Sequence, residues 1–328
     1  MRVLFVVNRA SGTGRAERLA GEFVSACEGV GVVAAVCDAR DERPEGMERK
    51  KFLQKHDCVA VVGGDGSLHH LLEAVRGAGS GTGVENAGDV EGMGVPVYHI
   101  PAGTENLFAR EFGMTREPEV FVRALERGRL RTIDLGRLGG NEREKERRNA
   151  ERKRGERDFA LMVSFGPDAG VIHRLDKVRS RAVGHVAYLR PVLEEVLKPR
   201  VAHVRVRVDG QEVVGGTCGE RGMLVVANSR QYARRLDPAR KADMTDRLLD
   251  VVFLPGQTTA KMVCWAARCA MGEHLENEEA VWVRGREIEV VACGQTPWQC
   301  DGEAGGWLEE GEGMKIRVEP GAVRVLEP

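Results

Sequence analysis

The chain has 328 residues, 42% of them hydrophobic, with eight cysteines and a formal net charge of -1. This length can bury a full core and predicts two domains of ordinary size. The near-neutral charge gives no overall attraction to nucleic acid, and the absence of CxxC pairs and clustered histidines argues against a disulfide framework or a zinc site. The first residues enter a strand directly and no apolar run reaches membrane-spanning length, so we expect a cytoplasmic protein without a nucleic-acid partner.

The first part of the chain alternates predicted strands and helices. Residues 2–7 predict a buried parallel strand, and further strands are predicted at 32–37, 57–62, 96–100 and 132–138. Helices are predicted at about 15–27, 44–55, 67–76 and 107–112, with a polar, glycine-rich surface loop at 77–94. This rhythm predicts a parallel sheet covered by helices, with ligand-binding loops at the carboxyl ends of its strands.

The most distinctive segment is VAVVGGDGSLHHLLEAV, residues 59–75, in which a strand ends in glycines and a helix follows. Glycines allow a tight backbone and the close approach of an anion, and the helix start directs amides and a positive dipole end towards it. The segment therefore predicts a phosphate site. Asp65 would repel a bare phosphate, which makes sense if a divalent cation lies between them. The alternative, a helix-capping aspartate, leaves the glycine density unexplained.

Beyond Phe159 the pattern changes to short strands separated by turns. The dipeptides Asp209-Gly210 and Pro320-Gly321 predict two of these turns, and the segment as a whole predicts an antiparallel, mostly β domain. Helices interrupt it at about 171–197 and 258–271. Residues 141–158 mix positive and negative charges, which predicts a solvated insertion rather than a lipid or nucleic-acid contact.

Four motifs occur in a fixed order: NxxSGxG after the first strand, GGDGS after the third, PAGTEN after the fourth and a late DGE. This order resembles the diacylglycerol kinase catalytic family, which includes bacterial lipid kinases and the sphingosine and ceramide kinases. The resemblance implies an N-terminal Rossmann-like, phosphofructokinase-like parallel α/β domain and a C-terminal antiparallel β-sandwich domain, with the active site in the cleft between them. We predict domains at 1–135 and 136–317, with a tail of about 318–328 packing back on the first.

The resemblance implies roles for matching residues. Asp65 would hold the magnesium of ATP, and Glu303, with Asp301 beside it, would be the base. Asp168 would meet the lipid head group, although a turn-forming aspartate after Pro167 is an alternative. The residues expected to bind the nucleotide are Asn8, Ser11, Gly12, Gly64, Asp65, Gly66, Ser67, Leu68, His69, Gly103, Thr104 and Asn106. For the first and last of these loops the alternative is a simple helix cap, and for Glu303 it is an exposed hairpin carboxylate.

KADMTDRLLDVVFL resembles the family's metal-binding turn, which implies a structural magnesium held by the Asp246 carboxylate and the carbonyls of Asp243 and Leu248. Hard oxygen ligands suit that ion. Arg247 stands where the family usually has glycine, and His70 where it usually has glutamate. Both departures bear on metal binding.

These observations predict an ATP-dependent, magnesium-assisted lipid kinase that phosphorylates the hydroxyl of a diacylglycerol-like or sphingoid-like lipid. One alternative is a kinase related to NAD kinase or phosphofructokinase, since those also use GGDG loops; the late DGE and the PGAVRVLEP ending favour the lipid branch. The other is a nucleotide-binding regulatory protein that has lost catalysis. The lipid substrate implies peripheral work at the inner membrane face, and an exposed edge strand of the second domain could pair to form a homodimer.

Overall fold

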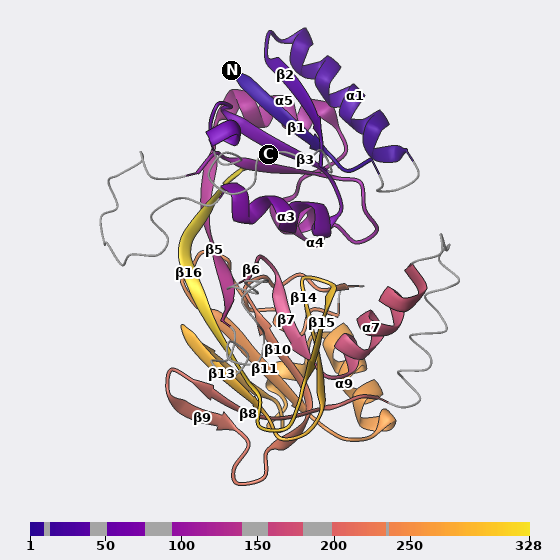
Figure 1. Cartoon of the computed structure of the whole chain (residues 1–328), viewed down its shortest axis with the longest axis vertical. Coiled ribbons are helices and arrows are strands. Elements are labelled where there is room, and N and C mark those ends of the chain that lie inside the picture. The colour runs from indigo at the N-terminus through magenta and orange to yellow at the C-terminus, as the bar shows by residue number, and fades with distance from the viewer. Residues whose placement is uncertain (10–13, 40–50, 76–93, 140–156, 180–198, 234–235) are drawn as a thin grey trace, which may run out of the picture. The chain divides into compact units, whose positions relative to one another are not determined.

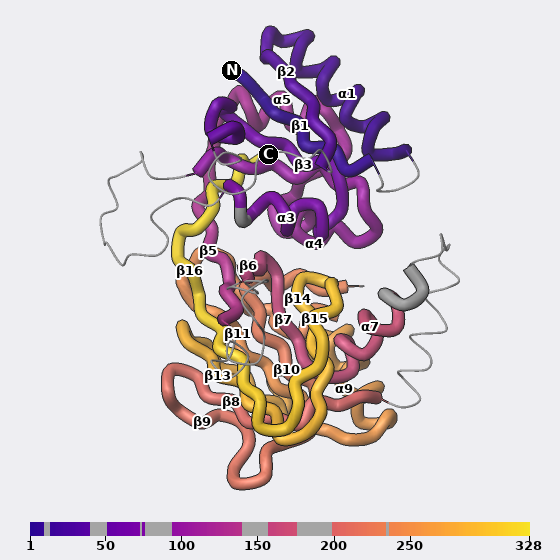
Figure 2. The backbone as a smooth tube through the Cα atoms, viewed as in Figure 1, coloured from indigo at the N-terminus to yellow at the C-terminus, as the bar shows by residue number. Residues whose placement is uncertain are grey.

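The computed structural model describes residues 1–9, 14–39, 51–75, 94–139, 157–179, 199–233 and 236–328. The chain divides into two compact units, residues 1–135 with 319–328 and residues 136–318. It passes from one unit to the other within β5 (Leu130–Gly139) and returns within β16 (Gly313–Leu326). Figure 2 shows the last part of β16, in yellow, among the strands of the first unit.

The first unit is a parallel sheet in the order β2-β1-β3-β4, extended by the end of β16 beside β4. Helices α1 and α5 lie on one side of β1 and β3, and α3 and α4 lie on the other (Figure 1). The strands are β1 (Arg2–Val7), β2 (Val33–Asp38), β3 (Cys58–Gly63) and β4 (Val97–Pro101). The helices are α1 (Arg15–Gly29), α3 (Asp65–Val75), α4 (Leu107–Phe112) and α5 (Pro118–Arg127).

Helix α5 is an element that the sequence analysis does not predict. Its charged residues obscure a short apolar stripe, yet Phe121 is fully buried and is the centre of the aromatic packing of this unit. The Phe121 ring lies 5.9 Å from that of Phe5 in β1, 5.8 Å from that of Phe23 in α1 and 4.6 Å from that of Tyr98 in β4. The helix also has local signals that the sequence analysis passed over: Pro118 opens it, a left-handed Gly128 ends it, and its buried residues lie on one face.

The second unit is built from antiparallel pairs. One run of strands is β15-β14-β7-β10-β11-β12. A second is β8-β13-β16 with β9 beside β8, and the start of β10 also pairs with β8. The strands are β6 (Arg157–Phe159), β7 (Met162–Phe165), β8 (Ala202–Val208), β9 (Gln211–Val214), β10 (Glu220–Ala227), β11 (Leu249–Pro255), β12 (Val281–Gly285), β13 (Glu287–Ala292), β14 (Thr296–Cys300) and β15 (Glu303–Leu308). The helices are α7 (Pro167–Arg179), α9 (Thr259–Met271) and the 3-10 helix η4 (His274–Glu276).

Strands β10 and β11 are buried on both faces, which explains their continuous apolar runs. Leu224 and Val226 face a core shared with β8 and β13, whereas Val225 and Ala227 face a second core closed by Trp265 of α9. Alternation along a strand sends successive side chains to opposite faces, so both sets can be apolar only where both faces are covered. The fold class predicted from the sequence, a parallel α/β part followed by an antiparallel β part, is confirmed.

Two local predictions are wrong. The helix after the glycines starts at Asp65 rather than at residue 67, so the GGDGS motif supplies the first helical turn as well as the loop. No turn forms at Pro320-Gly321: β16 continues through both residues, because Gly321 takes a φ of +60° within the strand and its amide donates to Asp134 Oδ1 at 2.7 Å. A glycine can take a left-handed backbone conformation inside a strand, and the strand then bends there without ending.

Several predicted segments lie outside the described residues. They are Ser11 and Gly12 of the first loop, most of the helix at 44–55, the loop at 77–94, most of the insertion at 141–158 and the end of the helix at 171–197. Among the helices of the described residues, none is long and apolar enough to cross a membrane.

Candidate active site

Three predicted loops of the first unit meet at one edge of its sheet, because each follows the carboxyl end of a parallel strand. Asn8 follows β1, Gly64 follows β3, and Gly103 follows β4. The Asn8 side chain donates from Nδ2 to Ser67 Oγ at 2.8 Å, and the Ala102 amide donates to the Gly63 carbonyl at 2.8 Å. The three motifs are thus hydrogen-bonded to one another.

The two glycine loops touch backbone to backbone. A Cβ placed on Gly103 would lie 2.7 Å from the Gly64 Cα, and one placed on Gly64 would lie 3.4 Å from the Gly103 Cα. A Cβ on Gly63 would lie 2.5 Å from Ser67 Oγ. Close approach therefore disfavours a side chain at Gly63 and Gly103, whereas one at Gly64 would only just touch its neighbour, and none of the three has a positive φ.

Asp65 joins the same two loops through its side chain. Its Oδ2 accepts the amide of Leu107 at 3.0 Å and its Oδ1 accepts the amide of Phe108 at 3.1 Å, so the carboxylate caps the start of α4. The sequence analysis weighed a capping role for Asp65 only at its own helix; the structure gives it that role at a helix 42 residues later. A carboxylate has about four lone-pair positions, and these two bonds leave acceptor capacity on both oxygens.

Asn106 fixes the shape of the second loop. Its side chain accepts the Gly103 amide through Oδ1 at 2.8 Å and donates through Nδ2 to the Gly103 carbonyl at 2.9 Å. The residue adopts a φ of 51°, in the left-handed region that asparagine tolerates better than most residues. Thr104 lies exposed at the tip of this loop.

The remaining residues of the GGDGSLHH motif contribute either backbone amides at the start of α3 or side chains that pack in the core. The Ser67 and Leu68 amides both donate to the Gly64 carbonyl, and among the hydrogen bonds of the described residues none uses the amides of Asp65 and Gly66. Those two amides are the donors that the start of α3 offers to an anion. The Leu68 side chain is 1% exposed and that of His69 is 5% exposed, so both pack inside the unit. His70 is exposed on α3.

His99 is part of this site, although nothing in the sequence analysis singled it out. It is fully buried, and its Nε2 lies 3.1 Å from the Gly63 carbonyl oxygen, to which it donates. Burial lowers the pKa of the imidazole, and the neighbouring Asp65 opposes that shift. The neutral ring with a proton on Nε2 holds the strand end that leads into the glycines.

In the second unit, Asp301 lies in the turn between β14 and β15 and Glu303 directly follows it, as the sequence predicts, but their carboxylates differ. Asp301 is 7% exposed; its Oδ2 accepts the Ala160 amide at 2.8 Å, and its Oδ1 accepts the Leu161 and Met162 amides at 2.9 Å each. Three backbone amides thus address this carboxylate, and the catalytic role expected from the sequence stays a prediction.

Glu303 is half-buried and pairs with a side chain of β6. Its Oε2 accepts a hydrogen bond from Arg157 Nη2 at 2.7 Å. Arg157 lies at the end of the charged insertion, so a residue assigned to a solvated run orients the carboxylate that the sequence nominates as a base.

Asp168 lies at the start of α7, where four hydrogen-bond donors surround its carboxylate. Its Oδ2 accepts from Ser164 Oγ, from the Tyr232 hydroxyl at 3.0 Å and from Gln299 Nε2 at 3.4 Å, and its Oδ1 accepts from the Ala169 amide at 2.7 Å. Burial raises the pKa of Asp168, and these hydrogen bonds oppose the shift. Burial and the adjacent carboxylate raise the pKa of Tyr232, which therefore remains a donor. Sequence reasoning missed Ser164, Tyr232 and Gln299 because they come from three separate strands and loops.

The predicted metal-binding turn keeps its backbone shape despite the arginine. Arg247 adopts a φ of 64°, the left-handed conformation for which glycine is usual. Asp246 Oδ1 accepts the Leu248 amide at 3.0 Å, and its Oδ2 lies 3.3 Å from Arg284 Nη1. Asp243 accepts from the Thr245 amide and hydroxyl. One carboxylate and nearby carbonyls suit Mg²⁺, but a guanidinium already pairs with that carboxylate, and the described residues contain no group of three acidic, histidine or cysteine side chains arranged for a metal.

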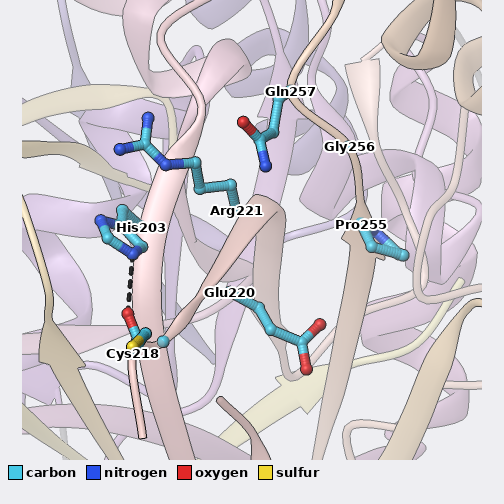
Figure 3. A pocket seen from close by; sticks show the side chains of 8 residues that line it. His203, Cys218, Glu220, Arg221, Pro255, Gly256 and Gln257 are labelled. Carbon is cyan, nitrogen blue, oxygen red and sulfur yellow. Dashed lines mark hydrogen bonds between the residues drawn. The ribbon is translucent and has the colours of Figure 1, made fainter. Parts of the chain in front are cut away.

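A surface pocket of the second unit, with a volume of about 370 Å³, lies apart from all these residues. It is lined by side chains of β8, β10 and the segment after β11, and Figure 3 shows His203 facing the Cys218 carbonyl, with 2.9 Å between them. None of the predicted site residues lines it. The pocket therefore gives no support for placing the substrate there.

Comparison with known proteins places these sites in a family. Residues 2–138 match the diacylglycerol kinase catalytic domain, and residues 161–327 match the YegS C-terminal NAD kinase beta sandwich-like domain. The chain is 28% identical over its whole length to a diacylglycerol kinase of Mycobacterium tuberculosis, covering 95% of that protein, and 22% identical to one of Bacillus subtilis over 79% of this chain and 75% of that one.

Among solved structures, a crystal structure of a diacylglycerol kinase from Bacillus anthracis aligns over 100% of this chain and 97% of its own, with a TM-score of 0.62 and 13% sequence identity. At that identity the likeness bears on the fold alone. The two domain matches are consecutive and together span almost the whole sequence. The chain belongs to the diacylglycerol kinase family, with a catalytic domain followed by a YegS-type β-sandwich domain.

Proposed function

We propose that this protein transfers the γ-phosphate of ATP to the hydroxyl group of a lipid, of the diacylglycerol or sphingoid class. The observation that carries the proposal is the interlocked pair of glycine loops beside the two unused amides of Asp65 and Gly66. Family membership and relatives described as diacylglycerol kinases support it. The position of the active site between the two domains remains a prediction.

The first unit would bind the nucleotide through its backbone. Amides at a helix start bind phosphate well because the dipole of the helix adds to the hydrogen bonds. Gly64 and Gly103 leave no side chain in the way of the phosphates, and Asn106 keeps the second loop in one shape. Phosphoryl transfer depends mainly on positioning and charge neutralisation, so a rigid cradle of this kind is what the reaction requires.

The second unit would hold and activate the acceptor. We assign Glu303 as the general base that takes the proton of the lipid hydroxyl, with Arg157 orienting its carboxylate. Asp168 would hydrogen-bond a polar group of the lipid head. Asp301 would position the turn that carries Glu303, because its own oxygens are occupied by three amides.

Magnesium would neutralise charge on the phosphates of bound ATP. Asp65 fits this assignment because its two accepted hydrogen bonds leave lone pairs on both oxygens. Asp246, Asp243 and Leu248 are the proposed holders of a structural ion, with Arg284 as a competitor for the carboxylate.

A labelled-ATP assay tests the proposal. The purified protein is incubated with ATP and Mg²⁺ and offered diacylglycerol, ceramide, a sphingoid base, undecaprenol or NAD in separate reactions. Transfer to a lipid is expected, with Glu303→Gln and Asp65→Asn each reducing it. Glu310→Gln, an exposed glutamate after the same hairpin, is the matched control and should leave the rate unchanged.

Each contrary outcome selects an alternative. Transfer to NAD alone would indicate a small-molecule kinase, and ATP binding without turnover on any acceptor would indicate a regulatory protein. Lipid phosphorylation that survives both substitutions would refute the assigned roles of Asp65 and Glu303.

A further inference from the structure

Gln299 in β14 is buried at 4% exposure and bridges two parts of the second unit. Its Oε1 accepts the Gly302 amide at 2.8 Å, and its Nε2 donates to Ser164 Oγ at 2.6 Å and lies 3.4 Å from Asp168 Oδ2. One end of this side chain therefore contacts the turn that precedes Glu303, and the other end contacts the surroundings of Asp168.

The direction of each hydrogen bond between Gly302, Gln299, Ser164 and Asp168 is fixed by the chemistry of the groups. The Gly302 amide can only donate, so the oxygen of the Gln299 amide must face it and the nitrogen must face Ser164. Ser164 Oγ then accepts from Gln299 and gives its own proton to Asp168 Oδ2. The result is a one-way relay of donors that begins at Gln299 and ends at the carboxylate, and linked hydrogen bonds of this kind polarise one another.

The turn at the other end can be compared with a second turn of the same type. Asp301 has a φ of 47° and Gly302 a φ of 81°, the two left-handed residues of a two-residue hairpin turn that pairs Cys300 with Glu303. The Asp209-Gly210 turn has the same two φ values. There the exposed aspartate accepts the amides of Arg286 and Glu287, and within the described residues no glutamine side chain is hydrogen-bonded to the Gly210 amide. The bridge through Gln299 is thus an addition to the turn and not a requirement of its type.

We infer that Gln299 is a positioning residue: it couples the carboxylate of Asp168 to the Asp301-Gly302 turn, so that the acceptor-binding group and the proposed base Glu303 are held in one geometry. This inference rests on the proposed function for the meaning of Asp168 and Glu303. The coupling itself is a property of the folded unit and can be measured without turnover.

The activity test separates the two ends of the bridge. Gln299→Leu removes both ends. Ser164→Ala removes the link to Asp168 through the serine hydroxyl and leaves only the 3.4 Å contact between Gln299 Nε2 and Asp168 Oδ2, whereas Gln299→Glu removes the amide donor; both variants leave an oxygen for the Gly302 amide. We expect each to lower kcat, by about 10- to 100-fold for Gln299→Leu, with the KM for ATP unchanged within about twofold, because small misplacements of reacting groups carry penalties of that size. The loss in the double variant Ser164→Ala/Gln299→Leu should be smaller than the product of the two single losses, because the two residues share one hydrogen bond.

The matched control is Gln295→Leu. Gln295 is an exposed glutamine four residues earlier whose side chain donates to Glu309, and the variant should behave as wild type. A wild-type kcat for both Ser164→Ala and Gln299→Glu would overturn the inference. An effect confined to the KM for ATP, with kcat unchanged, would overturn it as well. If Gln299→Leu does not fold, these two milder variants carry the test.

A second readout is independent of catalysis. In ¹⁵N NMR spectra the Gly302 amide should shift in Ser164→Ala, a residue that it does not touch, while the Gly210 amide of the matched turn should not. An unmoved Gly302 signal overturns the inference. If no lipid is phosphorylated by the wild type, the proposed function fails, and the NMR result still decides whether the bridge couples the two groups.

Discussion

The candidate sites of the two units are built from different materials. In the first unit the decisive contacts are between backbones, as at Gly64 and Gly103, and the one carboxylate caps a helix. In the second unit three carboxylates, Asp168, Asp301 and Glu303, are each held by a different set of donors. A backbone cradle suits a ligand that is identical in every turnover, and oriented side chains suit the acceptor and the proton transfer. The following variants test this contrast, beginning with the largest expected effect.

Asp301→Asn should unfold the second unit more easily without a direct effect on proton transfer. The substitution removes the charge that three amides address and turns an amide donor towards them. Hydrogen bonds to a charged group contribute about 1.5–3 kcal/mol each, and we expect a loss of about 3 kcal/mol. Denaturant unfolding measures it, with Glu303→Gln as the comparison that should keep wild-type stability. Equal losses in both variants would show that the two carboxylates do not differ as described.

Gly103→Ala should weaken the first unit by about 2 kcal/mol and reduce ATP binding, because its Cβ would lie 2.7 Å from the Gly64 Cα and push the loops apart. Isothermal titration with ATP and thermal unfolding measure the two effects. Gly21→Ala is the control: it lies within α1 with nothing near its added methyl group, and should be neutral or stabilising. A Gly103→Ala protein that binds ATP normally would contradict a cradle that depends on close approach.

Asp65→Ala should cost the first unit about 1 kcal/mol in stability, the usual value of a helix cap, since α4 loses the acceptor for two amides. Asp65→Asn should recover part of this, because its remaining oxygen can still accept, yet it should stay impaired in phosphoryl transfer. Thermal unfolding of the pair, read beside their rates, separates capping from catalysis. If Asp65→Asn regains full activity, the charge of Asp65 has no role in the reaction.

The smallest expected effect concerns His274, which lies outside the candidate site. Burial lowers its pKa, partly opposed by the hydrogen bond of its Nε2 to the Pro238 carbonyl at 2.6 Å. In the unfolded chain the His274 imidazole is protonated below about pH 6.5, whereas in the folded protein its pKa is lower. The contribution of His274 to the free energy of unfolding is therefore constant above that pH and falls as the pH drops below it. His274→Gln should remove this part of the pH dependence, under about 1 kcal/mol at pH 6. Urea unfolding at pH 7.5 and pH 6 measures it; an unchanged pH dependence would contradict the lowered pKa.

The amino-acid sequence was sufficient for much of the fold. Strands β1, β3 and β4 are continuous apolar runs with turn signals after them, and the Asp-Gly pairs at 209 and 301 mark hairpins. Helix α5 was overlooked although Pro118 and Gly128 mark its two ends, and the prediction failed at Pro320-Gly321, where a turn signal lies inside a strand. Local propensities hold until burial or strand pairing contributes more free energy than they do.

For the candidate site, the sequence by itself determined the order of the motifs, and hence the family and the residue types available for binding phosphate and accepting a proton. Only the tertiary structure decided what those residues do. It turned Asp65 towards a helix 42 positions later, committed Asp301 to three amides, and brought Ser164, Tyr232 and Gln299 around Asp168. The physical reason is that the role of a carboxylate depends on which groups donate hydrogen bonds to it. These donors come from strands and loops that are distant in the chain and meet only in the folded protein.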